Sequence, residues 1–276
     1  MQPTFLGLIC FFYLLSTCFF SLYLKKLSYA YLRLGRWFLG LAVALHFGFL
    51  LAWFLHKKIY VPSNALESQL AVLALVGFLC WTISVRKTLV FLSALVAPLI
   101  CIGLIFFQFM VGPNVGATLP NPWLWTHIVL AILGEAFFFF SALISVAYLL
   151  VEFQLRRRKA TTFFSRVPSL VDFDRILGEN LLAGFVLLTL GLILGVFFAN
   201  EYWTVGWFSD PKVLFALLTW LIYALLLALR AISPVYRGRR SAALSVIGFL
   251  GILLLSLGMP SEHHTIEQKP IEKIEK

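Results

Sequence analysis

Residues 123–151 read WLWTHIVLAILGEAFFFFSALISVAYLLV, with a single carboxylate and no lysine or arginine. An apolar run of about 20 residues is long enough to cross the roughly 30 Å hydrocarbon core of a bilayer as an α-helix. Similar runs recur along the 276 residues, of which 61% are hydrophobic and 12% charged. Soluble domains average about 45–50% apolar and about 25% charged residues. We therefore expect lipid to surround this fold.

The apolar runs predict an all-α, polytopic membrane helix bundle of about eight transmembrane helices. Their expected bounds are residues 3–24, 37–55, 65–85, 89–111, 123–151, 181–199, 211–231 and 241–258. We expect residues 1–258 to form a single transmembrane domain and residues 259–276 to form a flexible extracytoplasmic tail. Residues 161–180 form the longest predicted cytoplasmic connection, with a helix that Ser169 caps and that lies at the membrane interface.

The positions of lysine and arginine predict how the helices are oriented. Of the 22 basic residues, 16 fall in alternate connections, on one side of the predicted bundle. Cytoplasmic loops are enriched in Lys and Arg, so both termini are predicted to lie outside. Lys25 and Lys26 follow the first apolar run rather than precede it, which is the reverse of a cleaved signal peptide. We expect a retained first helix in a multi-pass protein of the inner (plasma) membrane.

The charge and the cysteines weigh against two other classes of protein. The formal net charge is +10, but the basic residues form short clusters between apolar runs, so we expect no nucleic-acid partner. The chain has no CxxCH motif and no cysteine spacing typical of a metal site, so it is not itself a c-type cytochrome. All four cysteines fall inside apolar runs and are expected to be small core residues: Cys10, Cys18, Cys80 and Cys101.

The histidines and an aromatic loop are the candidate functional features, because polar side chains are costly to place in a membrane. His46 falls near the middle of the second predicted helix, His127 at the outer end of the fifth, and His263 and His264 after the eighth. A lone helical histidine is commonly a hydrogen-bonded packing residue, but imidazole is also a good axial ligand for haem iron. Residues 199–212 read ANEYWTVGWFSDPK, which is also the composition of an interfacial aromatic belt.

The segment Pro168–Arg230 resembles the tryptophan-rich core of the cytochrome c assembly family, which includes CcsA-like and CcmC-like proteins and a HemX-like, YpjD-like branch. The outer loop is similar to the family pattern A-N-x-x-W-G-x-Y-W-S-W-D-P-K-E. Four further segments resemble family motifs in the same order: Pro62–Ser68 (P-L-S-N-L-Y-E-S), Pro168–Asp174 (P-S-L-x-x-L-D), Gly184–Gly191 (G-F-x-L-L-T-x-G) and the basic turn Arg237–Arg240. The resemblance covers most of the chain beyond the first helix.

This resemblance implies a protein that handles haem in the membrane and presents it at the outer face to apocytochrome c. It implies iron ligation by His127 and by His263 or His264, which are the candidate metal ligands. The other implied haem contacts are His46, Trp203, Trp207 and Asp210, the last also placed to cap the next helix before Pro211. The implied partners are haem, the lipid bilayer, apocytochrome c and a partner cytochrome c biogenesis membrane protein.

The departures from the family pattern keep other functions open. Thr204, Ser209 and Val213 replace motif residues, and Ala228 stands where the cytochrome-assembling proteins have a second membrane histidine. One alternative is a HemX-like membrane regulator of tetrapyrrole synthesis that acts on the level of glutamyl-tRNA reductase. Another is a transporter with a polar path through His46, Gln108 and Glu135. In none of these is a stand-alone enzyme expected.

Overall fold

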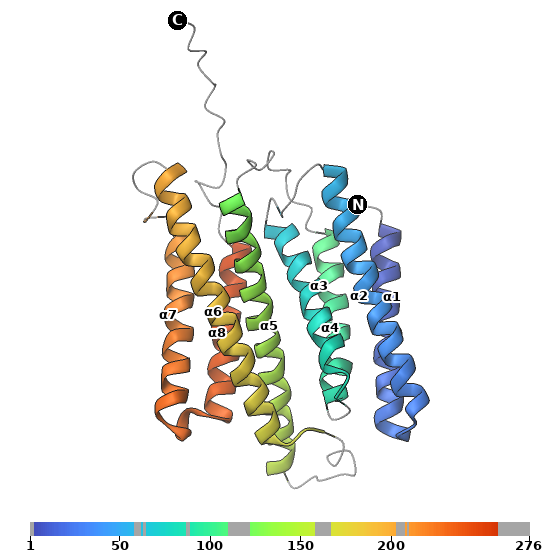
Figure 1. Cartoon of the computed structure of the whole chain (residues 1–276). Coiled ribbons are helices and arrows are strands. Elements are labelled where there is room, and N and C mark those ends of the chain that lie inside the picture. The colour runs from blue at the N-terminus through green and yellow to red at the C-terminus, as the bar shows by residue number, and fades with distance from the viewer. Residues whose placement is uncertain are drawn as a thin grey trace, which may run out of the picture.

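A computed structural model describes residues 3–57, 62, 65–86, 89–109, 122–157, 167–202, 208 and 210–258. Within these ranges the chain forms eight α-helices, and a short 3-10 helix, η4, precedes the last of them (Figure 1). The bounds are α1 Pro3–Lys26, α2 Tyr29–Lys57, α3 Ala65–Ile83, α4 Val90–Phe109, α5 Pro122–Arg156, α6 Leu170–Tyr202, α7 Pro211–Ile232, η4 Pro234–Tyr236 and α8 Arg239–Gly258. The predicted all-α bundle is confirmed, and the predicted tail, residues 259–276, lies outside the described ranges.

Six helices of the described chain are long and apolar enough to cross a membrane: α1, α2, α3, α5, α6 and α7. A shorter apolar helix, Val90–Phe106, forms most of α4, which contains Pro98. The helix α8 runs back along the bundle and packs against α5 and α7 (Figure 1). The chain is therefore a polytopic helical membrane protein.

The helices run alternately up and down, so their basic ends gather at one end of the bundle. Lys25 and Lys26 close α1, Arg156 closes α5, Arg230 lies in the last turn of α7, and Arg239 begins α8. We call this the cytoplasmic end, following the positive-inside rule. The first turn of α1 and the last turn of α8 both lie at the opposite, outer end (Figure 1).

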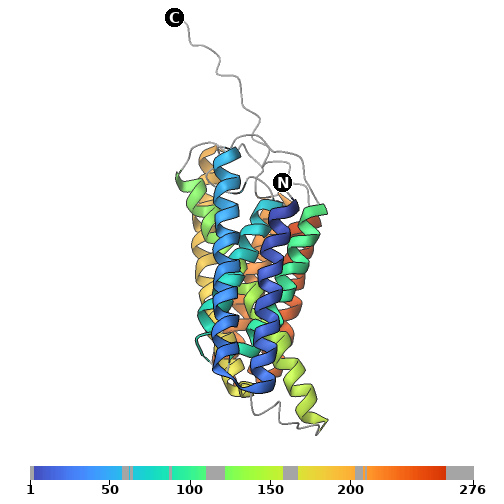
Figure 2. The same cartoon turned by 90° about the vertical axis from the view of Figure 1, so that its right-hand side faces the viewer.

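The bundle consists of two groups of helices, α1–α4 and α5–α8, that α5 joins through its contacts with α3 and α4 (Figures 1 and 2). A polar contact lies at this junction. Gln69 of α3 donates a hydrogen bond from Nε2 to Oε1 of Glu135 on α5. Gln69 is buried. Glu135 is partly buried, and a carboxylate in an apolar environment needs such a partner, so this bond links the two groups.

The prediction of a separate interfacial helix before the sixth transmembrane helix was wrong. Residues Leu170–Tyr202 form one continuous helix of 33 residues, which is about 50 Å long. Phe173 and Leu177, near the start of this helix, are buried in the bundle rather than exposed at the membrane interface. The predicted cap is confirmed, since the backbone N–H of Asp172 donates to Oγ of Ser169 at 3.1 Å.

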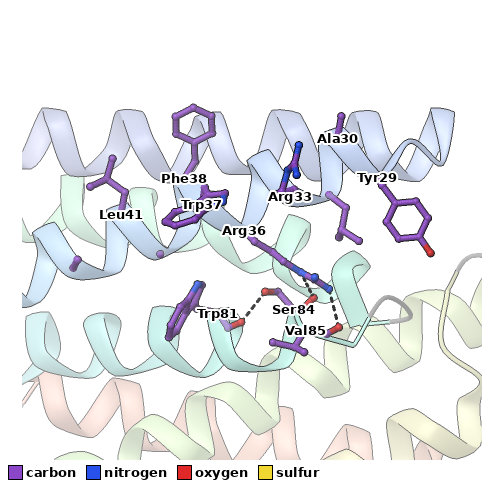
Figure 3. Close-up of a pocket in the computed structure, with 13 residues that line it drawn as sticks. Tyr29, Ala30, Arg33, Arg36, Trp37, Phe38, Leu41, Trp81, Ser84 and Val85 are labelled. Atoms are coloured by element: carbon purple, nitrogen blue, oxygen red, sulfur yellow. Dashed lines mark hydrogen bonds between the residues drawn. The ribbon is translucent and has the colours of Figure 1, made fainter.

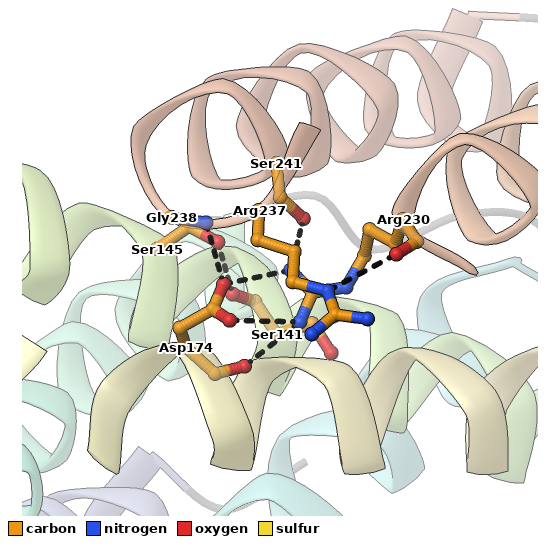
Figure 4. Close-up of polar contacts among 7 residues, drawn as sticks. All are labelled: Ser141, Ser145, Asp174, Arg230, Arg237, Gly238 and Ser241. Atoms are coloured by element: carbon orange, nitrogen blue, oxygen red, sulfur yellow. Dashed lines mark hydrogen bonds and ion pairs between the residues drawn. The ribbon is translucent and has the colours of Figure 1, made fainter. Parts of the chain in front are cut away.

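A polar cluster fixes the cytoplasmic ends of α6, α7 and α8 (Figure 4). Arg230 donates from Nη1 to Oδ1 of Asp174 at 2.8 Å and to Oγ of Ser241 at 2.6 Å. The backbone N–H of Gly238 donates to the same Asp174 Oδ1 at 2.7 Å. Gly238 has a φ of +63°, and a Cβ there would lie 2.7 Å from the hydroxyl of Tyr148. The turn thus requires glycine for both its backbone conformation and its space.

Replacing Arg230 with Ala should destabilise the bundle, because it leaves the Asp174 carboxylate without its cation. Removing one partner of a buried ion pair costs about 3–5 kcal/mol. The side chains of Arg230 and Asp174 are 11% and 20% exposed, so we expect a smaller loss of about 2–3 kcal/mol in unfolding free energy. Denaturant unfolding of the detergent-solubilised protein measures it.

Arg175→Ala is the matched control, because Arg175 pairs with Glu179 on the surface, where the two side chains are 79% and 57% exposed. Exposed pairs contribute about 0–1 kcal/mol. Equal destabilisation by the two substitutions would contradict a structural role for the Arg230 cluster.

Candidate functional site

His127 lies in the second turn of α5, at the outer end, and is partly buried against α6. Its Nδ1 lies 2.7 Å from the carbonyl oxygen of Gly191. A carbonyl oxygen only accepts, so the proton of this bond is on Nδ1 and the lone pair of a neutral ring is on Nε2. Histidines that bind metals commonly donate their second ring N–H to a carbonyl or carboxylate in this way. The ring is therefore held in the tautomer that a metal ligand needs.

Gly195 leaves the space for this ring on α6, and further glycines let α5 and α6 pack closely. A Cβ at Gly195 would lie 2.8 Å from Cε1 and 2.9 Å from Nδ1 of His127. Farther along the same contact, a Cβ at Gly134 would lie 3.1 Å from the backbone nitrogen of Leu188 and 3.2 Å from the carbonyl oxygen of Gly184. Small residues let membrane helices approach until their backbones touch. We call Gly134, Gly184, Gly191 and Gly195 the glycine contact.

The packing of α8 brings its last turn to the level of His127. The helices α5 and α8 are antiparallel: Gly238, just before α8, lies beside Tyr148, and the ring of Phe249 stacks on that of Phe139 with 4.7 Å between the ring centroids. Extending this register pairs the end of α8, at Gly258, with the first turns of α5. His263 and His264 lie outside the described residues, but His263 follows Gly258 by a span of at most about 18 Å.

Asp210 lies at the same outer end, directly before α7, which begins at Pro211 as predicted. Its side chain is buried, and its carbonyl oxygen accepts the first helical bond, from Leu214 N, at 3.1 Å. The position of α7 against α6 is fixed by Trp220, whose Nε1 donates to Oγ1 of Thr189 at 2.9 Å. Trp203 and Trp207 lie outside the described residues.

His46 occupies a different place, buried within the group α1–α4. Its Nδ1 lies 3.4 Å from the hydroxyl of Tyr13, and its Nε2 has no hydrogen-bond partner among the described residues. Gly77 of α3 makes room for the Tyr13 hydroxyl, which a Cβ there would overlap. Ala228, at the position of the second membrane histidine, is exposed on α7 in the other group. The structure does not bring His46 and His127 together.

Glu67 lies near the outer end of α3, in the motif Pro62–Ser68, and the sequence did not predict its contacts. Glu67 is buried, and its Oε1 accepts hydrogen bonds from Nε1 of Trp53 at 3.0 Å and from Nζ of Lys57 at 2.5 Å. These bonds tie the outer ends of α2 and α3 together. Lys57 and Glu67 lie on different helices, so no regular spacing in the sequence indicates that they form an ion pair.

The cysteines follow the prediction with one exception. Cys10, Cys80 and Cys101 are buried, whereas Cys18 is exposed on the surface of the bundle, so its assignment to the core was wrong. Cys10 and Cys101 contact each other's backbone: the Sγ of Cys101 lies 3.5 Å from the carbonyl oxygen of Cys10. Within the described ranges all four are free thiols, and no group of three or more His, Cys, Asp or Glu side chains is arranged to hold a metal ion.

We predict that Gly134→Leu separates α5 from α6, because the new side chain meets backbone rather than a movable side chain. Overpacking a close contact costs about 1–3 kcal/mol of unfolding free energy. The control is Gly48→Leu on α2, where a Cβ meets nothing within 4 Å, so the expected change is within about 0.5 kcal/mol. Thermal unfolding in detergent distinguishes the two, and equal midpoints would contradict the close packing of α5 on α6.

Comparison with known proteins places these features in context. The family model described as "Cytochrome C assembly protein" matches residues 62–266. The chain is 30% identical to the "Cytochrome c biogenesis protein CcsA" of Prochlorococcus marinus subsp. pastoris, over 93% of this chain and 89% of that protein. It is 31% identical to the protein of the same name from Atropa belladonna, over 52% of this chain and 55% of the relative.

Proposed function

Because the chain belongs to the cytochrome c assembly protein family, we propose that it handles haem in the membrane during c-type cytochrome biogenesis. The coarser role, a membrane protein of c-type cytochrome assembly, follows from the family itself. The proposal adds a bound substrate, haem, and a place for it at the outer end of α5. It also makes the protein an assembly factor of the inner (plasma) membrane rather than a stand-alone enzyme.

The observation that carries this proposal is the hydrogen bond from His127 Nδ1 to the Gly191 carbonyl. It holds the imidazole in one tautomer and one orientation before any haem arrives, which lowers the cost of forming an Fe–N bond. The ring sits in the space that Gly195 leaves on α6.

The remaining contacts of the proposed site come from the outer loop and the tail. His263 or His264 would supply the second iron ligand, since both follow closely after α8 in the sequence and the register of α8 brings its last turn to the level of His127. Trp203 and Trp207 would lie against the porphyrin, and Asp210 would fix the start of α7 beside them. A haem held this way is exposed to the outer face, where a separate partner protein would catalyse its attachment to apocytochrome c.

We propose this outer site in preference to one within the membrane because the chain lacks a second histidine at that depth. The Nε2 of His46 has no hydrogen-bond partner in the described part of the chain, but His46 lies among α1, α2 and α3. Ala228 has no side chain that binds iron and is exposed on the other group of helices. In this protein His46 would at most form a single contact with haem in transit.

The direct test is haem binding by the purified full-length protein. Haem added to the wild type should give a Soret band of a histidine-ligated iron, and His127→Ala should lose it because the ligand is gone. His56→Ala is the control, since His56 is exposed at the end of α2. A Soret band unchanged in His127→Ala, or absent from the wild type after haem addition, would refute the ligand assignment.

A second variant separates ligand orientation from ligand identity. Gly195→Ala keeps His127 but forces its ring to move, because the new Cβ would lie 2.8 Å from Cε1. Loss of a partner that orients a metal ligand weakens metal affinity about 10–100-fold, and we expect a loss of haem affinity in that range. Gly251→Ala on α8, where a Cβ meets nothing within 4 Å, should bind haem like the wild type. Equal affinity in the two variants would contradict the role of the Gly195 space.

Function in cells distinguishes an assembly factor from a regulator of tetrapyrrole synthesis. A deletion strain should lose covalent haem staining of its c-type cytochromes while total haem stays unchanged, and the wild-type gene but not His127→Ala should restore the staining. Normal staining together with raised glutamyl-tRNA reductase would overturn the proposed function.

A further inference from the structure

A groove of about 960 Å³ lies on the surface of the bundle between α2 and α3, at the cytoplasmic end (Figure 3). We call it the α2–α3 groove. Apolar and aromatic side chains form its walls, and two arginines of α2, Arg33 and Arg36, lie along it. It is far from His127, which lies at the outer end of α5, so it plays no part in the proposed haem site.

The two arginines have different environments. Arg36 is held in place by the end of α3: its Nε donates to the carbonyl oxygen of Ser84 at 2.8 Å and its Nη2 to that of Val85 at 2.7 Å (Figure 3). Arg33 lies one turn earlier, is exposed, and has no hydrogen bond or ion pair with any residue in the described part of the chain. The groove therefore presents two positive charges, and none of its described lining residues is a carboxylate.

The walls of the groove are suited to a chain of methylene groups. Trp37 is 73% exposed and Trp81 42% exposed, which leaves both rings open to a ligand. A Cβ at Gly40 would lie 2.8 Å from Nε1 of Trp81, so the missing side chain lets this ring lie close to α2. From Tyr29 to Ala44 the lining residues cover about 22 Å of helix. This exceeds the roughly 15 Å that one leaflet contributes to the hydrocarbon core.

We propose that the α2–α3 groove binds an anionic phospholipid of the cytoplasmic leaflet, with the phosphate at Arg33 and Arg36 and an acyl chain along Trp37 and Trp81. Two observations favour this ligand. The positive charges lie near the cytoplasmic ends of the helices, at the depth of the head groups of a leaflet that carries anionic lipids. The rest of the groove is apolar and opens sideways on the bundle, where acyl chains surround the protein. A soluble anion would gain nothing from these walls.

Native mass spectrometry of the full-length protein, released from detergent after equilibration with defined lipids, tests this proposal. The wild type should retain one phosphatidylglycerol more readily than phosphatidylcholine of the same acyl chains. Arg33→Gln should weaken retention of phosphatidylglycerol about fivefold, which is the contribution of one basic residue near an anionic membrane surface, and weaken retention of phosphatidylcholine less, because its choline group offsets the phosphate charge. Arg175→Gln is the charge control, because Arg175 is also exposed but lies on α6, away from the groove.

A second pair of variants tests the walls without changing charge. Ala44→Phe places a ring in the groove, where Ala44 is an exposed lining residue, and should reduce retention of phosphatidylglycerol. Ala52→Phe adds the same ring to an exposed position of α2 outside the groove and should not. Equal retention of the two lipids by the wild type would overturn the proposal. So would equal effects of Arg33→Gln and Arg175→Gln, or displacement of the lipid by haem in an Arg33-dependent manner, which would make the groove a haem site.

Discussion

The close approach of α5 and α6 is the constraint on which the rest of this bundle depends. In lipid, helices gain little from burying apolar side chains, because the acyl chains are equally apolar, and close backbone packing replaces that driving force. Gly134, Gly184, Gly191 and Gly195 provide it here. The same helix, α5, also contacts α3, α4 and α8, so the glycine contact positions the helix that joins both groups. It also brings the Gly191 carbonyl within hydrogen-bond distance of His127.

Contacts between helices explain the residues of three short motifs in the second half of the chain. In Pro168–Asp174, Ser169 caps α6 and Asp174 holds Arg230. In Gly184–Gly191, both terminal glycines belong to the glycine contact, and Thr189 accepts a hydrogen bond from Trp220. The basic turn before α8 contains Gly238, whose backbone N–H completes the Asp174 cluster. The first and third motifs therefore connect helices at the cytoplasmic end of the bundle, and the second connects α6 to α5 and α7 along its length.

The sequence predicted the number, order and direction of the helices well, because apolar length and the positions of Lys and Arg are local properties of the chain. It failed where a contact between distant helices decides the outcome. The helix that continues from Leu170 through α6 was predicted as a separate interfacial segment, since its burial against other helices is not visible in its own periodicity. His127 was identified from its type and position, but its acceptor, Gly191, is 64 residues away and carries no side chain to mark it. The Gln69–Glu135 and Glu67–Lys57 contacts escaped prediction for the same reason.

Haem ligation by a preoriented His127 is the central claim, and chemical rescue tests it most directly. The variant His127→Gly removes the ring but leaves the space beside Gly195, so added imidazole should enter and restore the Soret band of the haem-loaded protein. The restored spectrum should depend on imidazole concentration and match that of the wild type. If His127→Gly binds haem with the wild-type spectrum in the absence of imidazole, His127 is not the ligand and the claim is wrong.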